Sequence, residues 1–246
     1  MANPFTSTVA PKIPQPTNRL LAGTASGILR QPCLARINFQ FGSLKVNGSN
    51  FARVADAIDS GRIKCWTVKE FESQGADELA PGMIVNAQYQ IKPNAILFSS
   101  EDFGRNPGED RTIVHEAVHA AFDLDAPLGK KTPTLSIEDE SAAVVAVAFY
   151  IRLCKKEVGG FLMDAEGPEK AALALVDSVA DRSGPFPTWP GPYIFTQQDT
   201  QAIRTGTATK WHFDQFIASD GRWTDNSGAK YVYDGVPACS RRNVCK

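Results

Sequence analysis

Apolar residues recur along this chain with two different periods, which together predict both helices and strands. Between positions 51 and 58 they recur at three- and four-residue intervals, so they share one face of a helix. Short runs of β-forming residues at 35–41 and 62–68 flank this helix. The spacing therefore predicts a strand–helix–strand unit in the first third of the chain.

A hairpin and three helices are predicted after this unit. Two β-forming runs at 87–91 and 95–98 are joined by the turn sequence Lys-Pro-Asn. The periodic segments that follow predict helices at 111–122, 136–156 and 168–183. Asp110 is placed to cap the first of them. A shorter helix at 197–211 and a strand at 229–233 are expected further on.

The composition divides the chain into three parts. Residues 1–20 contain four prolines among small polar residues, which predicts a flexible N-terminal arm. Residues 21–183 contain the predicted long helices and the hairpin. Residues 184–246 open with a Pro- and Gly-rich connector at 184–192, and we expect this C-terminal segment to pack on the same domain.

Composition and charge exclude several classes of protein and partner. The chain has 246 residues, of which 43% are hydrophobic and 22% charged, as in ordinary globular proteins. A net charge of -1 argues against a broad electropositive surface, so nucleic acid and anionic membranes are not expected partners. The longest apolar run, 142–151, has half of the about 20 residues that a membrane span requires.

The start of the chain and the cysteines bear on its location. Because no continuous apolar stretch of a secretory signal is visible, the compartment stays open: the protein is cytoplasmic, is exported by a signal-independent route, or has lost its signal. Five scattered cysteines without a C-x-x-C pair exclude a disulfide scaffold. Cys154 follows an apolar helical run and is expected to be a buried thiol. Cys239 and Cys245 are the close pair that could form a small disulfide.

The segment with candidate chemistry reads H-E-A-V-H at 115–119, inside a predicted helix. His115 and His119 are one turn apart, so both imidazoles can bind one metal ion. Glu116 lies about 100° round the helix, where it could take a proton from bound water. Imidazole ligands suit zinc, and three protein ligands leave a fourth position for water. The alternative is an amphipathic helix that carries these residues by chance.

The third ligand is expected on the next helix, which begins with Glu138, Asp139 and Glu140. Glu138 aligns with Lys156 on what should be the solvent face. Glu140 points toward the apolar side, where a carboxylate is costly unless it is paired or binds a metal. Glu140 is therefore the expected third ligand, with Glu138 as its main competitor.

The succession of a hairpin, an H-E-x-x-H helix and a helix with a glutamate resembles the zincin metallopeptidases, in their gluzincin branch. The resemblance covers residues 87–154 and implies an α+β, zincin-like catalytic domain whose small mixed sheet ends beside the active-site helix. It implies one zinc ion held by His115, His119 and Glu140. It also implies hydrolysis of peptide bonds with Glu116 as general base. The same residues resemble small bacterial H-E-x-x-H proteins.

The sequence departs from related patterns at two places. The metzincin extension is missing, because Phe122 and Asp125 occupy the positions of its glycine and third histidine. The familiar Asn-Glu start of the gluzincin ligand helix is Asp139-Glu140 here. The second departure concerns the choice of glutamate more than the class of protein.

Further candidates have both a functional and a structural interpretation. His212 could stabilise the oxyanion of a tetrahedral intermediate, or it could pack between aromatic residues. Asp123 and Asp125 could orient a ligand imidazole, but we favour solvated carboxylates there. Besides a peptide or protein substrate, a protein partner for delivery or inhibition is possible. The alternative functions are a toxin or effector with the same chemistry, or a catalytically silent binding protein on a zincin scaffold.

Overall fold

The structure is a computed structural model that describes residues 17–73, 86–154, 167–183, 192–210 and 230–237. Within these residues the fold is α+β, with seven α-helices, two three-stranded mixed sheets and one two-stranded sheet. The α+β class therefore agrees with the sequence prediction. Within the described residues, no helix combines the length and the apolar character that crossing a bilayer requires.

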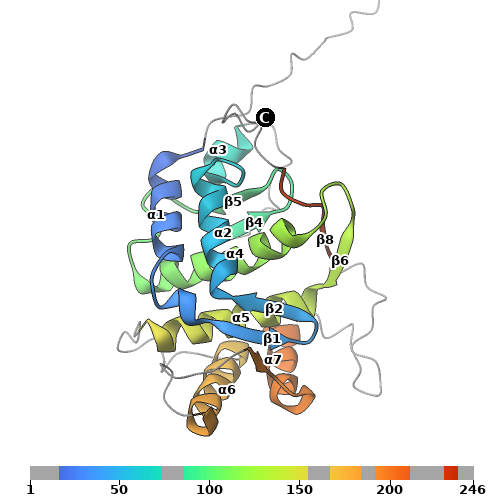
Figure 1. Ribbon diagram of the computed structural model, residues 1–246. Coiled ribbons are helices and arrows are strands. Elements are labelled where there is room, and N and C mark those ends of the chain that lie inside the picture. The colour runs from blue at the N-terminus through green and yellow to red at the C-terminus, as the bar shows by residue number, and fades with distance from the viewer. Residues whose placement is uncertain (1–16, 74–85, 155–166, 184–191, 211–229, 238–246) are drawn as a thin grey trace, which may run out of the picture.

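The helices form layers on both sides of a central pair. Helices α4 and α5 contact each other; α1 and α2 pack on α4, while α6 and α7 pack on α5 (Figure 1). The helices are α1 (Arg19–Leu29), α2 (Gly48–Asp59), α3 (Val68–Glu72), α4 (Pro107–Asp125), α5 (Ser136–Leu153), α6 (Gly167–Ser183) and α7 (Gln197–Lys210), with a 3₁₀ turn at Leu34–Arg36. The predicted helices after residue 135 are confirmed within the described residues.

Strands from distant parts of the sequence pair in three small sheets. The strands are β1 (Asn38–Phe41), β2 (Leu44–Asn47), β3 (Lys64–Thr67), β4 (Ala87–Gln90), β5 (Ala95–Phe98), β6 (Thr132–Leu135), β7 (Tyr193–Ile194) and β8 (Lys230–Tyr233). The first sheet has the order β2-β1-β7 and the second β3-β5-β4, and β6 pairs with β8. In both three-stranded sheets the central strand has one parallel and one antiparallel neighbour.

The predicted hairpin is confirmed as β4 and β5. They pair antiparallel, with Ala87 opposite Phe98 and Gln90 opposite Ala95. All four residues of β5 are buried, because β5 is the central strand and has apolar side chains against both of its faces. Strand β4 contacts α4, so a small mixed sheet does end beside the H-E-x-x-H helix.

The predicted strand–helix–strand unit is only partly correct. Its helix is α2, but β1 and β3 belong to different sheets. The reason is the unpredicted strand β2, which turns back on β1 through Gly42 at φ 57°. This turn conformation favours glycine, because a Cβ makes the left-handed region costly.

The N-terminal helix begins inside the range expected for the flexible arm. The Asn18 side chain accepts hydrogen bonds from the amides of Leu20 and Leu21 and so caps α1, which begins at Arg19. The Asn18 amide also donates to the Cys65 carbonyl at 2.8 Å, which attaches this segment to β3. Residues 1–16 of the expected arm and 184–191 of the expected connector lie outside the described residues.

Helix α4 begins earlier than predicted. Its cap is Asn106, whose side chain accepts from the amides of Gly108 and Glu109, followed by Pro107 at the first helical position. Asp110, the predicted cap, is instead buried inside the first turn and accepts a hydrogen bond from the Tyr150 hydroxyl at 3.2 Å. The earlier start extends α4 toward the domain surface by one turn.

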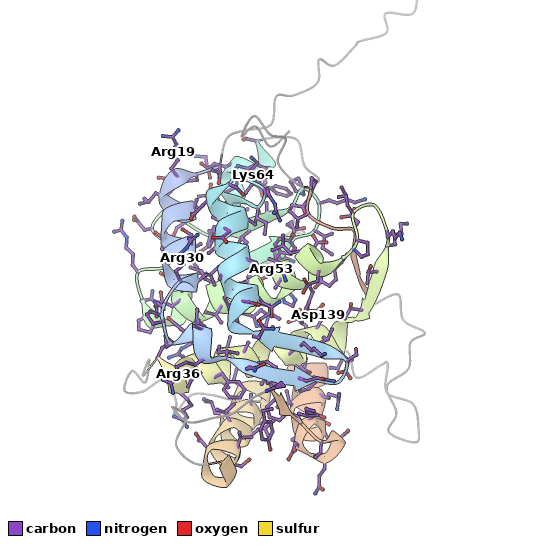
Figure 2. The ribbon with its side chains drawn as sticks, in the orientation of Figure 1. Arg19, Arg30, Arg36, Arg53, Lys64 and Asp139 are labelled. Atoms are coloured by element: carbon purple, nitrogen blue, oxygen red, sulfur yellow. A yellow bond between two sulfur atoms is a disulfide. The ribbon has the colours of Figure 1, made fainter. Side chains whose placement is uncertain are left out.

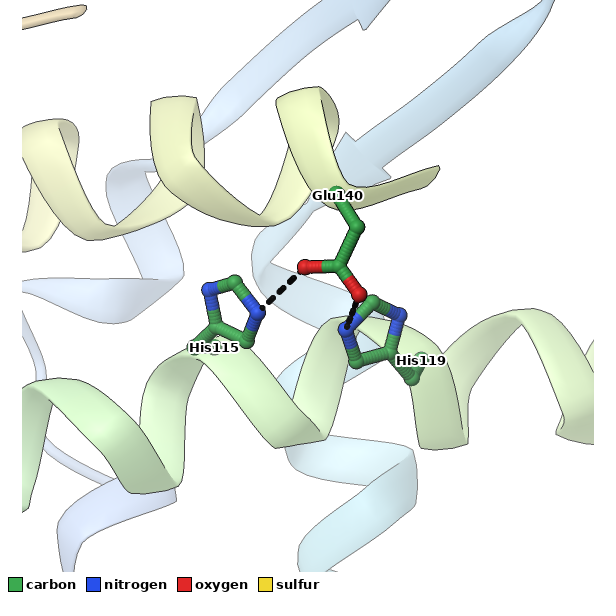
Figure 3. Close-up of side chains that lie close together, drawn as sticks. All are labelled: His115, His119 and Glu140. Atoms are coloured by element: carbon green, nitrogen blue, oxygen red, sulfur yellow. Dashed lines mark hydrogen bonds and ion pairs between the residues drawn. The ribbon is translucent and has the colours of Figure 1, made fainter. Parts of the chain in front are cut away.

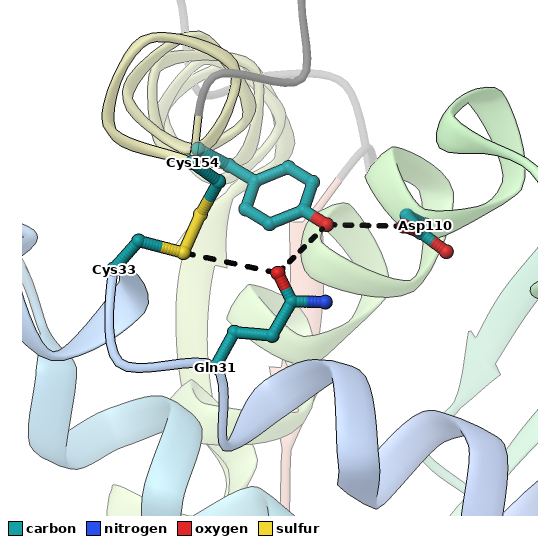
Figure 4. The surroundings of a disulfide bond; sticks show 5 residues. Gln31, Cys33, Asp110 and Cys154 are labelled. Carbon is teal, nitrogen blue, oxygen red and sulfur yellow. Dashed lines mark hydrogen bonds between the residues drawn. A yellow bond between two sulfur atoms is a disulfide. The ribbon is translucent and has the colours of Figure 1, made fainter.

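Cys154 is not the free thiol that the sequence suggests. It forms a disulfide with Cys33, which precedes the 3₁₀ turn, across a sequence separation of 121 residues (Figure 4). Among the described cysteines Cys65 is free, and burial raises the pKa of its thiol. Cys239 and Cys245, the predicted close pair, lie outside the described residues.

The outer face of α1 and α2 carries charges of both signs. Arg30, the residue that follows α1, pairs with Asp56 and Asp59 on α2 at 2.7 Å each. Arg53 on α2 pairs with Asp125 of α4 at 2.5 Å. Figure 2 labels both arginines on this side of the molecule. The charges of these two arginines are thus neutralised locally by aspartates.

Candidate metal centre

Helix α4 places its two histidines against the first turn of α5. His115 and His119 lie one turn apart, with ring centroids separated by 5.0 Å. Glu140 comes down from α5 between them: its Oε2 is 3.0 Å from Nε2 of His115, and its Oε1 is 3.6 Å from Nε2 of His119 (Figure 3). The three residues that the sequence selects as ligands therefore meet at one place.

This group could hold a metal ion. One ligand atom of each of the three residues lies within 4.8 Å of those of the other two. His119 and Glu140 are buried, whereas the side chain of His115 is 17% exposed. Two imidazole nitrogens and a carboxylate oxygen form a donor set that zinc accepts. Solvent reaches the group at His115.

Asp139 and Tyr233 support the second histidine. Asp139 Oδ1 lies 2.6 Å from Nδ1 of His119, and its Oδ2 accepts a hydrogen bond from the Tyr233 hydroxyl at 2.5 Å. In the neutral imidazole that a metal ion requires, a proton on Nδ1 held by Asp139 leaves the lone pair of Nε2 directed at Glu140. His119, Asp139 and Tyr233 are all buried. The arrangement fixes both the tautomer and the direction of the imidazole.

The surrounding charges favour a cation at this position. Burial by itself lowers the pKa of His119, but the carboxylates of Asp139 and Glu140 outweigh burial and raise it to about 10. The same carboxylates attract a metal ion, which must displace the proton from Nε2 of His119 in order to bind.

Glu116 lies beside the cluster and contacts the neighbouring sheet. Its Oε2 accepts a hydrogen bond from the Tyr89 amide of β4 at 2.7 Å. Burial raises the pKa of Glu116, and the nearby His115 and His119 partly oppose this effect. Glu116, the candidate base, thus extends from α4 to the edge strand β4 of the sheet.

Glu138, the competing third ligand, faces away from the histidines. Its carboxylate forms two contacts with the Arg204 guanidinium of α7, at 2.7 Å and 3.0 Å. The expectation of a solvent face at Glu138 is wrong, because α7 covers this side of α5. Helical periodicity cannot predict that Glu138 is covered by a helix whose contacting residue, Arg204, lies 66 residues further along the chain.

The two aspartates at the end of α4 have different environments. Asp123 is fully buried, contrary to our expectation, and accepts hydrogen bonds from the Tyr89 hydroxyl at 2.7 Å and the Gly235 amide at 2.9 Å. Asp125 is half exposed and pairs with Arg53, so the expectation of a solvated carboxylate holds there. The carboxylate that contacts the imidazole of a candidate ligand is Asp139, which the sequence placed among the acidic residues at the start of the ligand helix. His212 lies outside the described residues.

Comparison with protein-family models, with curated proteins and with solved structures finds no match to this chain. The functional argument therefore depends on the geometry and chemistry of the site itself.

Proposed function

We propose that this protein is a zinc-dependent metallopeptidase of the zincin type. The observation that carries the proposal is the convergence of His115 and His119 from one helix with Glu140 from the next, with Glu116 beside them. The donor set, its burial and the support of His119 by Asp139 are the features that a catalytic zinc site needs. The mixed sheet that ends beside α4 agrees with the zincin resemblance.

The residues of the site have distinct roles in this proposal. A zinc ion bound there would supply a Lewis acid and make hydroxide available near neutral pH. Glu116 accepts the proton from the attacking water and returns it to the nitrogen of the leaving amine. The hydrogen bond from the Tyr89 amide holds the Glu116 carboxylate in place for this proton transfer. Asp139 keeps His119 in the tautomer that presents Nε2.

Two variants test the proposal. Zinc per chain is measured by elemental analysis after dialysis against a weak chelator, and cleavage is measured on a peptide library. We expect stoichiometric zinc in the wild type. Glu140→Ala should lose zinc, because only two of the three protein ligands, the imidazoles, remain. Glu116→Gln should retain zinc and lose at least about 100-fold in cleavage rate, since it cannot carry the proton.

Asp125→Asn is the matched control, because Asp125 lies on the same helix as the histidines but pairs with Arg53. It should keep both zinc and cleavage. A wild type that takes up no zinc when zinc is offered would overturn the metal centre. Cleavage by Glu116→Gln at the parental rate would overturn the assigned mechanism.

A catalytically silent metal-binding protein is the second candidate. It is favoured by the burial of Glu116, which is 7% exposed, and by the hydrogen bond that this residue accepts from the Tyr89 amide. A carboxylate held in this way could serve structure alone. Stoichiometric zinc without cleavage of any library peptide by the wild type would support this candidate over the peptidase.

A further inference from the structure

Two contacts from α7 flank Glu140 along α5. Arg204 forms its paired contacts with Glu138, two residues before Glu140. The Ser141 hydroxyl, one residue after Glu140, donates to the Thr207 hydroxyl at 3.2 Å. Glu138 and Ser141 are three residues apart, so they share the face of α5 that is turned to α7, while Glu140 is on the face turned to α4.

The position of Glu138 is defined by more than its ion pair. Arg204 also donates to the Thr200 hydroxyl, and its guanidinium lies 4.8 Å from the centre of the Phe41 ring. A Cβ on Gly42 would come within 2.7 Å of Oε2 of Glu138, so this glycine leaves the space that the carboxylate fills. The β1–β2 turn and α7 together enclose Glu138.

Stability alone is a poor explanation for this arrangement. Arg204 is buried, and the Glu138 side chain is 20% exposed. Removing charges from water costs free energy that the attraction within a buried ion pair can fail to regain, so the presence of this pair is weak evidence for a gain in stability. Ser141 and Thr207 are fully buried as well. Rotation or sliding of the first two turns of α5 would break both contacts at once.

We propose that Arg204 is a positioning residue for the metal centre, and that α7 fixes the turn of α5 from which Glu140 reaches the histidines. This inference rests on the proposed metal site and adds an element that neither the H-E-x-x-H motif nor the ligand helix contains. It assigns a function to a part of the C-terminal segment: α7 sets the geometry of a ligand it does not touch.

The test uses the full-length protein and measures metal binding, with no dependence on turnover. Zinc affinity is determined by competition with a chelator, and the Co²⁺-substituted protein is examined by its visible absorption spectrum. We expect Arg204→Met to bind zinc about tenfold more weakly, as is usual when a support of a ligand is removed. Its Co²⁺ spectrum should also change, because the direction of the Glu140 carboxylate changes. Arg204→Lys should restore part of the affinity by keeping the charge.

Arg152→Met is the matched control. Arg152 lies near the other end of α5 and forms the same kind of paired contact, with Asp177 of α6 at 2.7 Å and 2.5 Å. Its loss should affect the free energy of unfolding and leave the zinc affinity and Co²⁺ spectrum unchanged. Thr207→Val tests the second contact with nearly the same volume, and it should weaken zinc binding even if Arg204→Met fails to fold.

The outcomes separate this proposal from the proposed function. If Arg204→Met, or Thr207→Val in its place, behaves like Arg152→Met in both metal measurements, the positioning role is wrong while the metal centre stands. If the wild type binds no zinc, both proposals are overturned. If the affinity falls as expected but no peptide is cleaved, the positioning role stands and the peptidase activity does not.

Discussion

Tyr233 is the outermost member of a chain of contacts that ends at a candidate ligand. Its hydroxyl donates to Asp139, and Asp139 holds Nδ1 of His119. Because all three side chains are buried, water cannot replace the hydroxyl as a donor without a rearrangement. The phenol therefore keeps the carboxylate turned toward the imidazole.

Tyr233→Phe should weaken zinc binding by about tenfold, because Asp139 loses the donor that fixes its second oxygen. The measurement is competition with a chelator at constant pH. Tyr150→Phe is the control, since Tyr150 is also buried and its hydroxyl also donates to an aspartate, Asp110, away from the cluster. Both variants should lose stability, but equal zinc affinity in the two would contradict the role assigned to Tyr233.

The sequence predicts the three candidate ligands better than their supports. The histidine spacing and the helical face of Glu140 follow from local periodicity, which the α-helix enforces over a few residues. Asp139 could have been recognised as a neighbour of the cluster, because it is adjacent to Glu140 on the same turn. Tyr233 could not, because 94 residues separate it from Asp139 and no local pattern encodes that contact.

At the scale of elements, α5 shows where the sequence prediction fails. The helix is correctly placed, but the side that we expected to face solvent is covered. Arg152 pairs with α6 on this side, and Glu138 pairs with α7. The continuous apolar run at 142–151 was the available signal, since a helix that is apolar all round is buried. Short strands are hard to predict for a different reason. Strand β2 has four residues of mixed polarity, which are too few to show an alternating pattern.

The contact between α6 and α7 depends on a glycine. A Cβ on Gly206 of α7 would lie 2.8 Å from the nitrogen and 3.0 Å from the Cα of Pro168 at the start of α6. Both are backbone atoms, so they cannot move aside as a flexible side chain can. The two helices approach this closely only because Gly206 has no side chain.

Gly206→Ala should lower the free energy of unfolding by about 1–3 kcal/mol, the usual cost of overpacking, despite the better helix propensity of alanine. Gly27→Ala in α1 is the matched control, because nothing lies within 4 Å of the added Cβ there. It should raise stability by about 0.5–1 kcal/mol. Urea unfolding measures both, and stabilisation by Gly206→Ala would contradict the close approach.

At the scale of the whole molecule, one disulfide joins the N-terminal helical layer to the end of α5. Cys33 and Cys154 have Cα atoms 5.2 Å apart and are separated by 121 residues. A crosslink of this span removes much of the conformational freedom of the unfolded chain. Disulfides persist in oxidising compartments, so the protein should be produced under oxidising conditions for all the measurements above.

The double variant Cys33→Ser, Cys154→Ser should lose about 2–5 kcal/mol of unfolding free energy, in line with the length of the closed loop. The measurement is denaturant unfolding under oxidising conditions, with the wild type in reductant as the control. Reductant should bring the wild type close to the double variant. A wild type that is insensitive to reductant would show that this bond contributes little.

The same bond turns residues 33–154 into a closed covalent ring, and His115, His119 and Glu140 all lie inside it. A protease that cuts one peptide bond within the ring opens it without releasing a fragment. The nicked molecule keeps its full mass on a gel until the disulfide is reduced. A single cut within the ring therefore leaves the candidate ligands covalently connected, so the molecule tolerates one cleavage better than its fold alone would allow.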